Sequence, residues 1–287
     1  MRLAKALPRP AVVVNADSAQ VYADLQVLSA RPTEDEMQGV PHRLFGTWDG
    51  AEACSAADWA NAAKREIADA HEAGAIPILV GGTGLYIRTL LDGISPIPAI
   101  NPEVRDEVRA LSTVDAYSAL QDVDPARAAI LHPSDSQRIA RALEVVRSTG
   151  RTLGEWQECK EGGIADRIAL APLVLLPDRD EVYTRCDARF EGMIQNGAVG
   201  EVEMLLARDL SPALPVMRAI GVPEIAGWLR GEWSREEAIE RGQQATRNYA
   251  KRQFTWLRNQ LPGEWSRLGP KNVEILDVFE ILFRSGG

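Results

Sequence analysis

The sequence lacks the features of a membrane protein or of a disulfide-bonded secreted protein. In its 287 residues, no uninterrupted apolar run approaches the ~18 residues that a membrane-spanning helix needs. Pro8 and Pro10 interrupt the basic, apolar opening, which therefore lacks a signal-peptide cleavage pattern. The three cysteines and three histidines are scattered without paired metal-ligand spacing, which favours incidental thiols over a disulfide framework or a zinc site. We expect a cytoplasmic protein with a globular core.

Basic residues are fewer than acidic ones, and the formal net charge is −9. A net acidic protein repels RNA at long range, because phosphate binding depends on Lys and Arg. Two segments depart from this balance. Residues 138–151 carry four arginines against Glu144 alone, and residues 241–258 carry five basic residues and no acid. This distribution is compatible with a protein that binds one nucleic acid through local basic surfaces.

Short apolar runs that alternate with helical patterns predict an α/β fold. The runs at residues 11–15, 76–80 and 168–176 have the continuous apolar character of buried parallel strands. Helical patterns follow them at residues 56–73, 85–91 and 180–197, the first of these ending at a glycine. We predict that the three strands form one parallel sheet with helices on both faces.

Strands give way to helices in the middle of the chain. Three prolines between residues 96 and 102 mark a linker, and helical patterns then dominate to residue 167. We predict a core domain in two parts, residues 1–98 and 168–287, with a small helical insertion at residues 99–167.

One helix of this insertion has clear ends and two faces. Ser134 or Asp135 caps its start, and Gly150 ends it. Apolar residues mark a buried face, whereas Arg138 and Arg141, three positions apart, share another face.

Asp17 lies just beyond the first apolar run, in the segment Asn-Ala-Asp-Ser. In parallel sheets, ligands sit outside the carboxyl ends of the strands. A carboxylate at this place can act as a general base or hold a metal ion through water, but it can equally cap a turn together with Ser18.

A run of glycines, Gly81-Gly82-Thr83-Gly84, follows the second predicted strand and precedes a helix. Exposed amides at a helix N-terminus attract anions, so the turn could hold phosphate. A tight turn that allows close packing is the alternative, and the residues alone favour it.

The segment from Ser234 onward predicts a long helix with a basic stripe. Ser234 and Glu237 form a capping box. At ~100° per residue, Tyr249 and Trp256 share one arc, while Arg247, Lys251 and Arg258 gather on the opposite side. No acidic residue alternates with the basic ones along the helix, and Phe254 beside them offers a stacking surface. This pattern favours RNA contact over a merely solvated face.

Six segments together resemble the bacterial tRNA dimethylallyltransferase family. They are VVVNADSAQVY at residues 12–22, PHRL at 41–44, GGTGLY at 81–86, QRIARALE at 137–144, MRAIG at 217–221 and YAKRQFTWLR at 249–258. The resemblance implies a P-loop-NTPase-like parallel sheet with helices on both faces and a small helical insertion domain that binds tRNA. It covers nearly the whole chain.

The resemblance also implies a reaction. A flipped adenine beside the anticodon would be prenylated on its exocyclic amine by dimethylallyl diphosphate. Asp17 would act as the base, and Mg²⁺ and basic groups would neutralise the diphosphate. Thr83 and Arg218 would be the diphosphate-binding and further catalytic residues. The residues implied to contact the tRNA anticodon stem-loop are Asp17, Ser18, Ala19, Gln20, Gln137, Arg138, Ile139, Ala140, Arg141, Arg247, Lys251, Arg252 and Arg258. We expect a monomer without a membrane partner.

Two departures from the family pattern are visible. Members usually follow the MRAIG-like segment with Tyr and a cation, where this chain has Val222 and Pro223. Members also begin with a strand and a Gly-x-x-x-x-Gly-Lys-Ser/Thr loop that binds diphosphate. This chain contains no Gly-Lys dipeptide, and Arg2 to Pro8 resembles the second half of the helix that follows such a loop.

The missing loop affects what we expect of the chain. Without the first strand and the P-loop, we expect the 287-residue polypeptide to be inactive and poorly stable. A catalytically inactive, N-terminally truncated tRNA-binding remnant is therefore the alternative to an active transferase. A nucleotide kinase is disfavoured, because it requires the same loop and leaves the basic helix unexplained.

Overall fold

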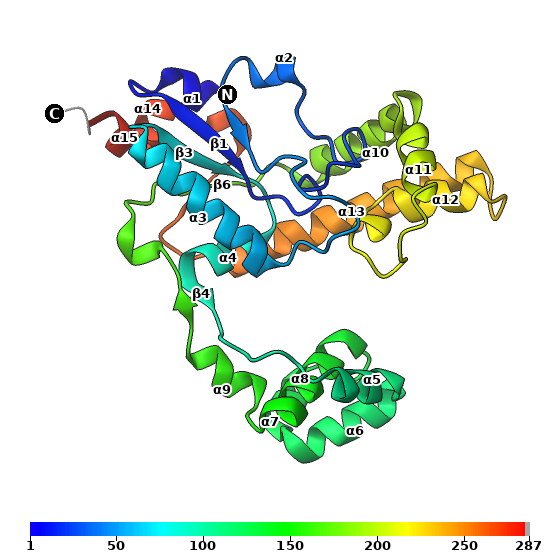
Figure 1. Ribbon diagram of the computed structural model, residues 1–287. Helices are drawn as coiled ribbons and strands as arrows, with labels where there is room; N and C mark the ends of the chain where they lie inside the picture. The colour runs from blue at the N-terminus through cyan, green and yellow to red at the C-terminus, as the bar shows by residue number, and fades with distance from the viewer. Residues whose placement is uncertain (285–287) are drawn as a thin grey trace. The chain divides into compact units, whose positions relative to one another are not determined.

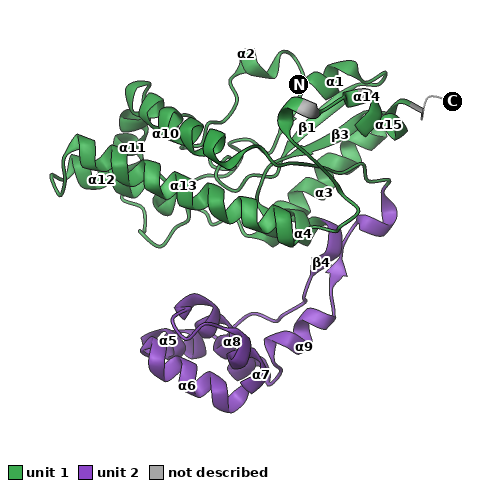
Figure 2. Cartoon of the chain, turned by 180° about the vertical axis from the view of Figure 1, so that it is seen from behind, with its two compact units in different colours: residues 1–90, 169–287 green, residues 91–168 purple. Residues whose placement is uncertain are grey.

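The structure, a computed structural model, describes residues 1–284 and divides the chain into two compact units. Unit 1 comprises residues 1–90 and the chain from residue 169 onward, and unit 2 comprises residues 91–168 (Figure 2). The first boundary was predicted at residue 98 rather than 90. It falls earlier because β4 (Gly93–Ile94) pairs antiparallel with β5 (Glu161–Gly162), which joins the two ends of the insertion.

The sheet of unit 1 is built around β1 (Ala11–Asn15). This strand pairs in parallel with β3 (Ile76–Val80) over its whole length (Figure 1). It also pairs in parallel with β2 (His42–Arg43) at Val13 and Val14. The predicted ranges of β1 and β3 are confirmed, whereas β2 was not predicted. Val13 and Val14 are buried, as expected of a strand covered on both faces.

The prediction of one sheet from three apolar runs is wrong for the described residues. The third run forms β6 (Leu173–Leu175), which pairs in parallel with β7 (Ser266–Leu268) in a separate sheet. No described strand joins β3 to β6. The α/β class with parallel sheets holds, but the strands are divided between two sheets.

The helices of unit 1 follow the predicted patterns. The 180–197 pattern forms α10, and the Ser234 capping box starts α13. The helices are α1 (Arg2–Ala6), α2 (Glu34–Met37), α3 (Ala56–Glu72), α4 (Gly84–Asp92, which runs across the unit boundary), α10 (Arg179–Gln195), α11 (Ala198–Leu206), α12 (Val222–Leu229), α13 (Arg235–Asn259), α14 (Ile275–Val278) and α15 (Glu280–Arg284), with 3₁₀ turns η2 (Val216–Arg218) and η3 (Pro270–Asn272).

Helix α3 fixes the carboxyl end of β1. Its Trp59 is fully buried and donates its indole N–H to the carbonyl of Asn15 at 2.8 Å. The same ring stacks on Tyr86 of α4, with centroids 4.6 Å apart. The end of β1 is thereby held against two helices, which makes it a rigid platform for the residues that follow.

Helices α10 and α13 pack closely because a glycine lies at their contact. A Cβ atom placed on Gly242 would lie 2.0 Å from the ring of Phe190, so only glycine fits at this position of α13. Phe190 itself is 2% exposed. This pair of helices forms the second half of the site described below.

Unit 2 is helical and has its own core. It contains α5 (Pro102–Ala110), α6 (Thr113–Val123), α7 (Pro125–Ile130), α8 (Ser136–Thr149), α9 (Leu153–Glu158) and the 3₁₀ turn η1 (Ala165–Arg167). Asp135 rather than Ser134 caps α8, and Gly150 ends it at φ +71°. The core residues are Val108, Ala116, Leu120, Ala128, Ile139, Ala142 and Leu143. Across the described parts of both units, every helix is too short or too polar to span a membrane.

Candidate active site

A cavity of about 700 Å³ lies within unit 1, where the segment after β1 meets α10, η2 and α13. The lining is apolar on several sides, with Leu25, Leu28, Phe190, Met193 and Ile220. Its charged lining residues are Asp17, Arg185, Arg189, Arg218 and Arg252. Asp17 is thus the only carboxylate among the lining residues of the described chain, facing four arginines. The cavity is basic in a protein whose net charge is −9, which fits an anionic ligand.

The turn after β1 holds the Asp17 side chain in the cavity. The amide of Asp17 donates to Asn15 Oδ1 at 2.8 Å, and Asn15 Nδ2 donates back to the Asp17 carbonyl at 3.0 Å. The Asp17 carboxylate accepts the amide of Ala19 at 2.9 Å. Buried Asn15 therefore fixes the backbone, while the carboxylate keeps an oxygen for a ligand.

Burial raises the pKa of the Asp17 carboxyl above its ordinary value. The Ala19 amide and the positive charge of Arg189 oppose this rise and are the smaller effects. A raised pKa gives the carboxylate greater affinity for a proton, which is a property of a general base. A purely structural turn would explain the hydrogen bond from the Ala19 amide. It would not explain why the Asp17 carboxylate lines the cavity.

Neighbouring protein atoms occupy the space around the glycine turn at residues 81–84. A Cβ atom on Gly82 would lie 2.5 Å from the Gln253 side chain, and one on Gly84 would lie 2.3 Å from the Trp256 ring. At Gly81 the added atom would lie 2.2 Å from the backbone of Ala16. These glycines allow α13 and the end of β1 to approach closely. The geometry therefore supports the close-packing alternative rather than an open phosphate cradle.

Thr83 lies beside the cavity rather than in its lining. Its Oγ1 accepts the amide of Ser18 at 2.9 Å, and its hydroxyl contacts Ser18 Oγ at 3.2 Å. The Tyr249 hydroxyl also bonds to Thr83 and Ser18, and burial raises the pKa of Tyr249, with a further contribution from Asp17. Thr83 thus ties the segment that carries Asp17 and Ser18 to the glycine turn and to α13.

Arg218 lines the cavity from η2 and has no ion-pair partner among residues 1–284. Its guanidinium is therefore available to an anion. The two residues that depart from the family pattern lie further along. Val222 is 1% exposed in the protein core and Pro223 falls in the first turn of α12, so neither offers a group to a ligand.

The basic stripe of α13 is divided between different environments. Arg247 is paired with Asp187 of α10 at 2.6 Å, so the stripe does have an acidic partner, supplied by a neighbouring helix. Arg252 lines the cavity, with its guanidinium 5.7 Å from the Tyr249 ring centre. Lys251 and Arg258 are exposed. These two residues remain the simplest candidates for phosphate contact outside the cavity.

Unit 2 holds the second set of residues that the resemblance assigns to tRNA. Gln137, Arg138 and Arg141 are exposed and Ala140 is half-buried. Ile139 is fully buried in the core of unit 2, so its side chain offers no exposed surface, and the assignment of this residue to the tRNA-binding segment stays a prediction. It is an apolar core position between exposed Arg138 and half-buried Ala140, as the spacing of α8 requires.

Arg185 and Arg189 are site residues that the sequence analysis did not identify. They lie four positions apart on α10, so both face the cavity. In the sequence they are indistinguishable from surface arginines, because their significance comes from the packing of α10 against α13. Arg189 also acts electrostatically on Asp17.

The described residues hold no cluster of protein ligands for a metal ion, since no group of three or more His, Cys, Asp or Glu side chains lies together in residues 1–284. Mg²⁺ is usually held by one or two carboxylates together with substrate phosphates and water. Asp17 at the cavity would therefore supply one carboxylate beside Mg²⁺ on a bound diphosphate, and Mg²⁺ stays a prediction.

The sequence matches the family model described as IPP transferase over residues 20–260. A tRNA dimethylallyltransferase of Novosphingobium aromaticivorans is 69% identical, over 90% of this chain and 92% of the relative. Another from Erythrobacter litoralis is 63% identical, over 99% of this chain and 90% of the relative.

Solved structures agree with these matches. A tRNA isopentenylpyrophosphate transferase from Bacillus halodurans superposes with a TM-score of 0.68 at 31% identity, covering 98% of this chain and 88% of that chain. A eukaryotic dimethylallyltransferase acting on tRNA superposes with a TM-score of 0.71 at 28% identity, covering 86% of this chain and 63% of that chain.

Proposed function

This chain belongs to the IPP transferase family of tRNA dimethylallyltransferases, and we propose that it transfers a dimethylallyl group from dimethylallyl diphosphate to tRNA. The acceptor is the N6 amine of the adenine adjacent to the anticodon. The observation that carries the proposal is Asp17, a carboxylate with a raised pKa in a cavity lined by four arginines.

In the proposed reaction the adenine leaves its stack and enters the cavity. The N6 nitrogen forms a bond to the allylic carbon while the bond from that carbon to the diphosphate oxygen breaks. The diphosphate departs with the electron pair. Asp17 takes the proton that the nitrogen loses as its new bond forms, so charge and atoms balance.

The arginines of the cavity supply the charge that the leaving diphosphate needs. Arg185 and Arg189 project from α10, and Arg218 projects from η2. Guanidinium groups bind phosphate oxygens bidentately, and their effect grows as negative charge develops in the transition state. We assign Thr83 a positioning role, through the Ser18 amide.

The tRNA requires a larger surface than the cavity. Lys251 and Arg258 on α13, and Gln137, Arg138 and Arg141 on α8, are exposed polar or basic residues. Within each unit, these residues support contact with tRNA phosphates. Phosphate contacts orient a nucleic acid but carry no information about its sequence.

The test is transfer of labelled dimethylallyl diphosphate to unmodified tRNA, with the product identified by nucleoside mass spectrometry. A tRNA with guanine in place of the target adenine is the matched control. A parallel reaction uses a version that carries a Gly-x-x-x-x-Gly-Lys-Ser/Thr segment ahead of Met1, the type of loop whose amides and lysine hold a diphosphate. Transfer by that version alone would mean that these arginines do not hold the diphosphate unaided. No transfer in either reaction would overturn the proposal.

A further inference from the structure

Glu201 is a buried acid that binds the backbone of a distant loop. It lies in the first turn of α11 and is 8% exposed. Its Oε1 accepts the amides of Gln26 and Val27 at 2.8 and 2.6 Å, and its Oε2 accepts the amide of Leu28 at 3.0 Å. A buried carboxylate is costly unless it is hydrogen-bonded, and three amide donors offset that cost here.

The loop that Glu201 holds is a wall of the active-site cavity. Leu25, Leu28 and Ser29 line the cavity. Hydrogen bonds also connect this loop to the segment that carries Asp17. Gln20 Nε2 donates to the carbonyls of Ser29 and Ala30 at 3.0 and 3.1 Å. Two successive sets of hydrogen bonds therefore link α11 to the segment that carries Asp17.

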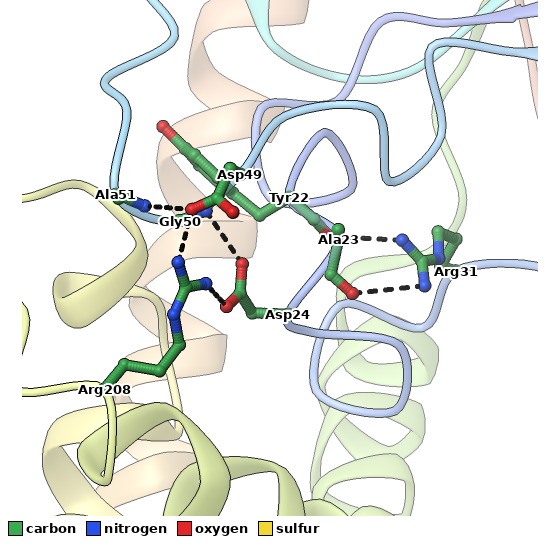
Figure 3. Close-up of polar contacts among 8 residues, drawn as sticks. All are labelled: Tyr22, Ala23, Asp24, Arg31, Asp49, Gly50, Ala51 and Arg208. Carbon is green, nitrogen blue, oxygen red and sulfur yellow. Dashed lines mark hydrogen bonds and ion pairs between the residues drawn. The ribbon is translucent and has the colours of Figure 1, made fainter.

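Arg208 makes a second attachment of the same segment, just beyond α11. Figure 3 shows its guanidinium between two carboxylates: it donates to Asp24 and, at 2.5 Å, to Asp49. Asp24 also accepts the amide of Gly50 at 2.8 Å. Asp24 is the better-shielded partner, with its side chain 10% exposed against 57% for Asp49.

Within the segment, Arg31 closes the loop upon itself. Its guanidinium donates to the carbonyls of Tyr22 and Ala23, as drawn in Figure 3, and its Nε donates to Gln26. The segment is therefore internally braced and attached to the body of unit 1 at two points, Glu201 and Arg208. A shift of either attachment displaces the braced segment as a whole.

We propose that Glu201 and Arg208 are positioning residues that hold residues 17–31 in the geometry that prenyl transfer requires. Neither residue lines the cavity, so they act through the loop. The catalytic part of this inference rests on the proposed function, whereas the mechanical part does not. A displacement of about 1 Å in a catalytic group lowers the rate by about a hundredfold, which makes such an attachment consequential.

The first experiment uses Glu201→Gln, which keeps the shape of the side chain. The amide group of glutamine puts an NH₂ against one of the three backbone N–H donors, so at least one bond is lost. The matched control is Glu203→Gln, which removes the same charge from an exposed position of the same helix. Amide hydrogen exchange followed by mass spectrometry gives a readout that does not depend on activity.

We expect exchange in residues 17–31 to accelerate about tenfold or more in Glu201→Gln and to stay unchanged in Glu203→Gln. In the transfer assay kcat should fall about 10- to 100-fold, while KM for tRNA stays within about twofold. A merely structural role would lower Tm but leave kcat per folded molecule intact. A fall in kcat per folded molecule therefore indicates that Glu201 positions the site, whereas a fall in Tm alone indicates a structural role.

Arg208→Gln provides the second variant, and it leaves Asp24, whose side chain is 10% exposed, with the Gly50 amide as a remaining donor. Arg230→Gln, which removes the exposed Arg230–Glu232 pair, is its control. We expect the same pattern, with a smaller loss of kcat. Unchanged exchange in residues 17–31 for Glu201→Gln and Arg208→Gln would overturn the attachment, and unchanged kcat would overturn the positioning role. If neither the wild type nor the version with the added loop transfers, the proposed function fails, and exchange alone decides whether the attachment exists.

Discussion

Asp17 occupies an environment that opposes its own ionisation. Burial raises the pKa of its carboxyl, while the Ala19 amide and the charge of Arg189 only partly offset the effect. Such a group is retained at a cost in stability, and residues of this kind cluster at functional sites. The Asp17→Asn variant tests both the catalytic role and the cost in stability. Asparagine keeps an oxygen for the Ala19 amide but cannot take a proton.

We expect Asp17→Asn to lower prenyl transfer by about 10²–10⁴-fold, the usual effect of losing a general base. Affinity for tRNA should stay within a few fold, because the basic residues outside the cavity are untouched. The variant should be the more stable protein at pH 7. Since the folded-state pKa of Asp17 is raised, ionisation of the wild-type residue costs stability as the pH rises through that pKa.

The advantage of Asp17→Asn should accordingly vanish below the ordinary aspartate pKa of 3.8. Thermal melts at pH 7 and at low pH, together with rate measurements, check both parts. Turnover equal to the wild type would remove Asp17 from the mechanism.

The same raised pKa sets the acid side of the pH–rate profile. A base must be ionised to act, so kcat/KM should fall as the pH falls through the pKa of Asp17. We expect the midpoint of this fall to lie above the ordinary value of 3.8. Arg189→Gln removes a charge that lowers this pKa, so it should move the midpoint to higher pH. A midpoint that does not move would contradict the electrostatic link between the two residues.

Lys251 and Arg247 look alike in the sequence, but the structure gives them different roles. Lys251 is exposed, whereas Arg247 is paired with Asp187. We expect Lys251→Ala to reduce the salt slope of tRNA binding by about one unit, as for one lost phosphate contact. Arg247→Ala should change the slope less and lower Tm more, because it leaves Asp187 without its partner. Binding titrations over a salt series, with melts of both variants, test the distinction. Equal changes in the salt slope would mean that Lys251 and Arg247 both contact RNA phosphates, and would contradict the distinction.

At the scale of elements, local signals located most of the structure. Continuous apolar runs gave β1 and β3 their bounds, and capping residues gave α8 and α13 their starts. β2 and β7 were missed because strands of two or three residues carry no periodicity. The division into two sheets, the pairing of Arg247 with Asp187 and the position of Arg189 depend on contacts between distant segments. No local pattern encodes them.

The glycine turn at residues 81–84 could be interpreted from sequence as a phosphate-binding turn or as a turn that allows close packing. The contacts of its glycines in the structure distinguish the two. Gly84→Ala would place a Cβ atom 2.3 Å from the Trp256 ring. We expect a loss of about 1–3 kcal/mol in the free energy of unfolding, as in other overpacked cores. Gly192→Ala, on α10 with open space around the added atom, should be neutral or stabilising by up to about 1 kcal/mol.

Denaturant unfolding measures both glycine variants, and the cost of Gly84→Ala should shrink when Trp256 is also changed to Ala. A cost that persists without Trp256 would mean that the turn itself, rather than its contact with α13, requires glycine.

At the scale of the whole molecule, the insertion has the properties of an independent folding unit. Its core draws only on residues within 91–168. Its ends are joined by the antiparallel pair of β4 and β5, so the segment is closed at its own base. Domains inserted in this way keep a separate hydrophobic core and can unfold separately.

We therefore expect two calorimetric transitions, one for each unit. Leu120→Ala, at a fully buried position of unit 2, should destabilise the transition of that unit by about 2–5 kcal/mol. Leu205→Ala, at a buried position of unit 1, should affect only the other transition. The isolated segment 91–168 should fold with the helical content of α5 to α9, as circular dichroism would measure. A single transition lowered equally by both substitutions would mean that the two cores unfold together, and the inserted helices could not then be treated as a separate platform for tRNA.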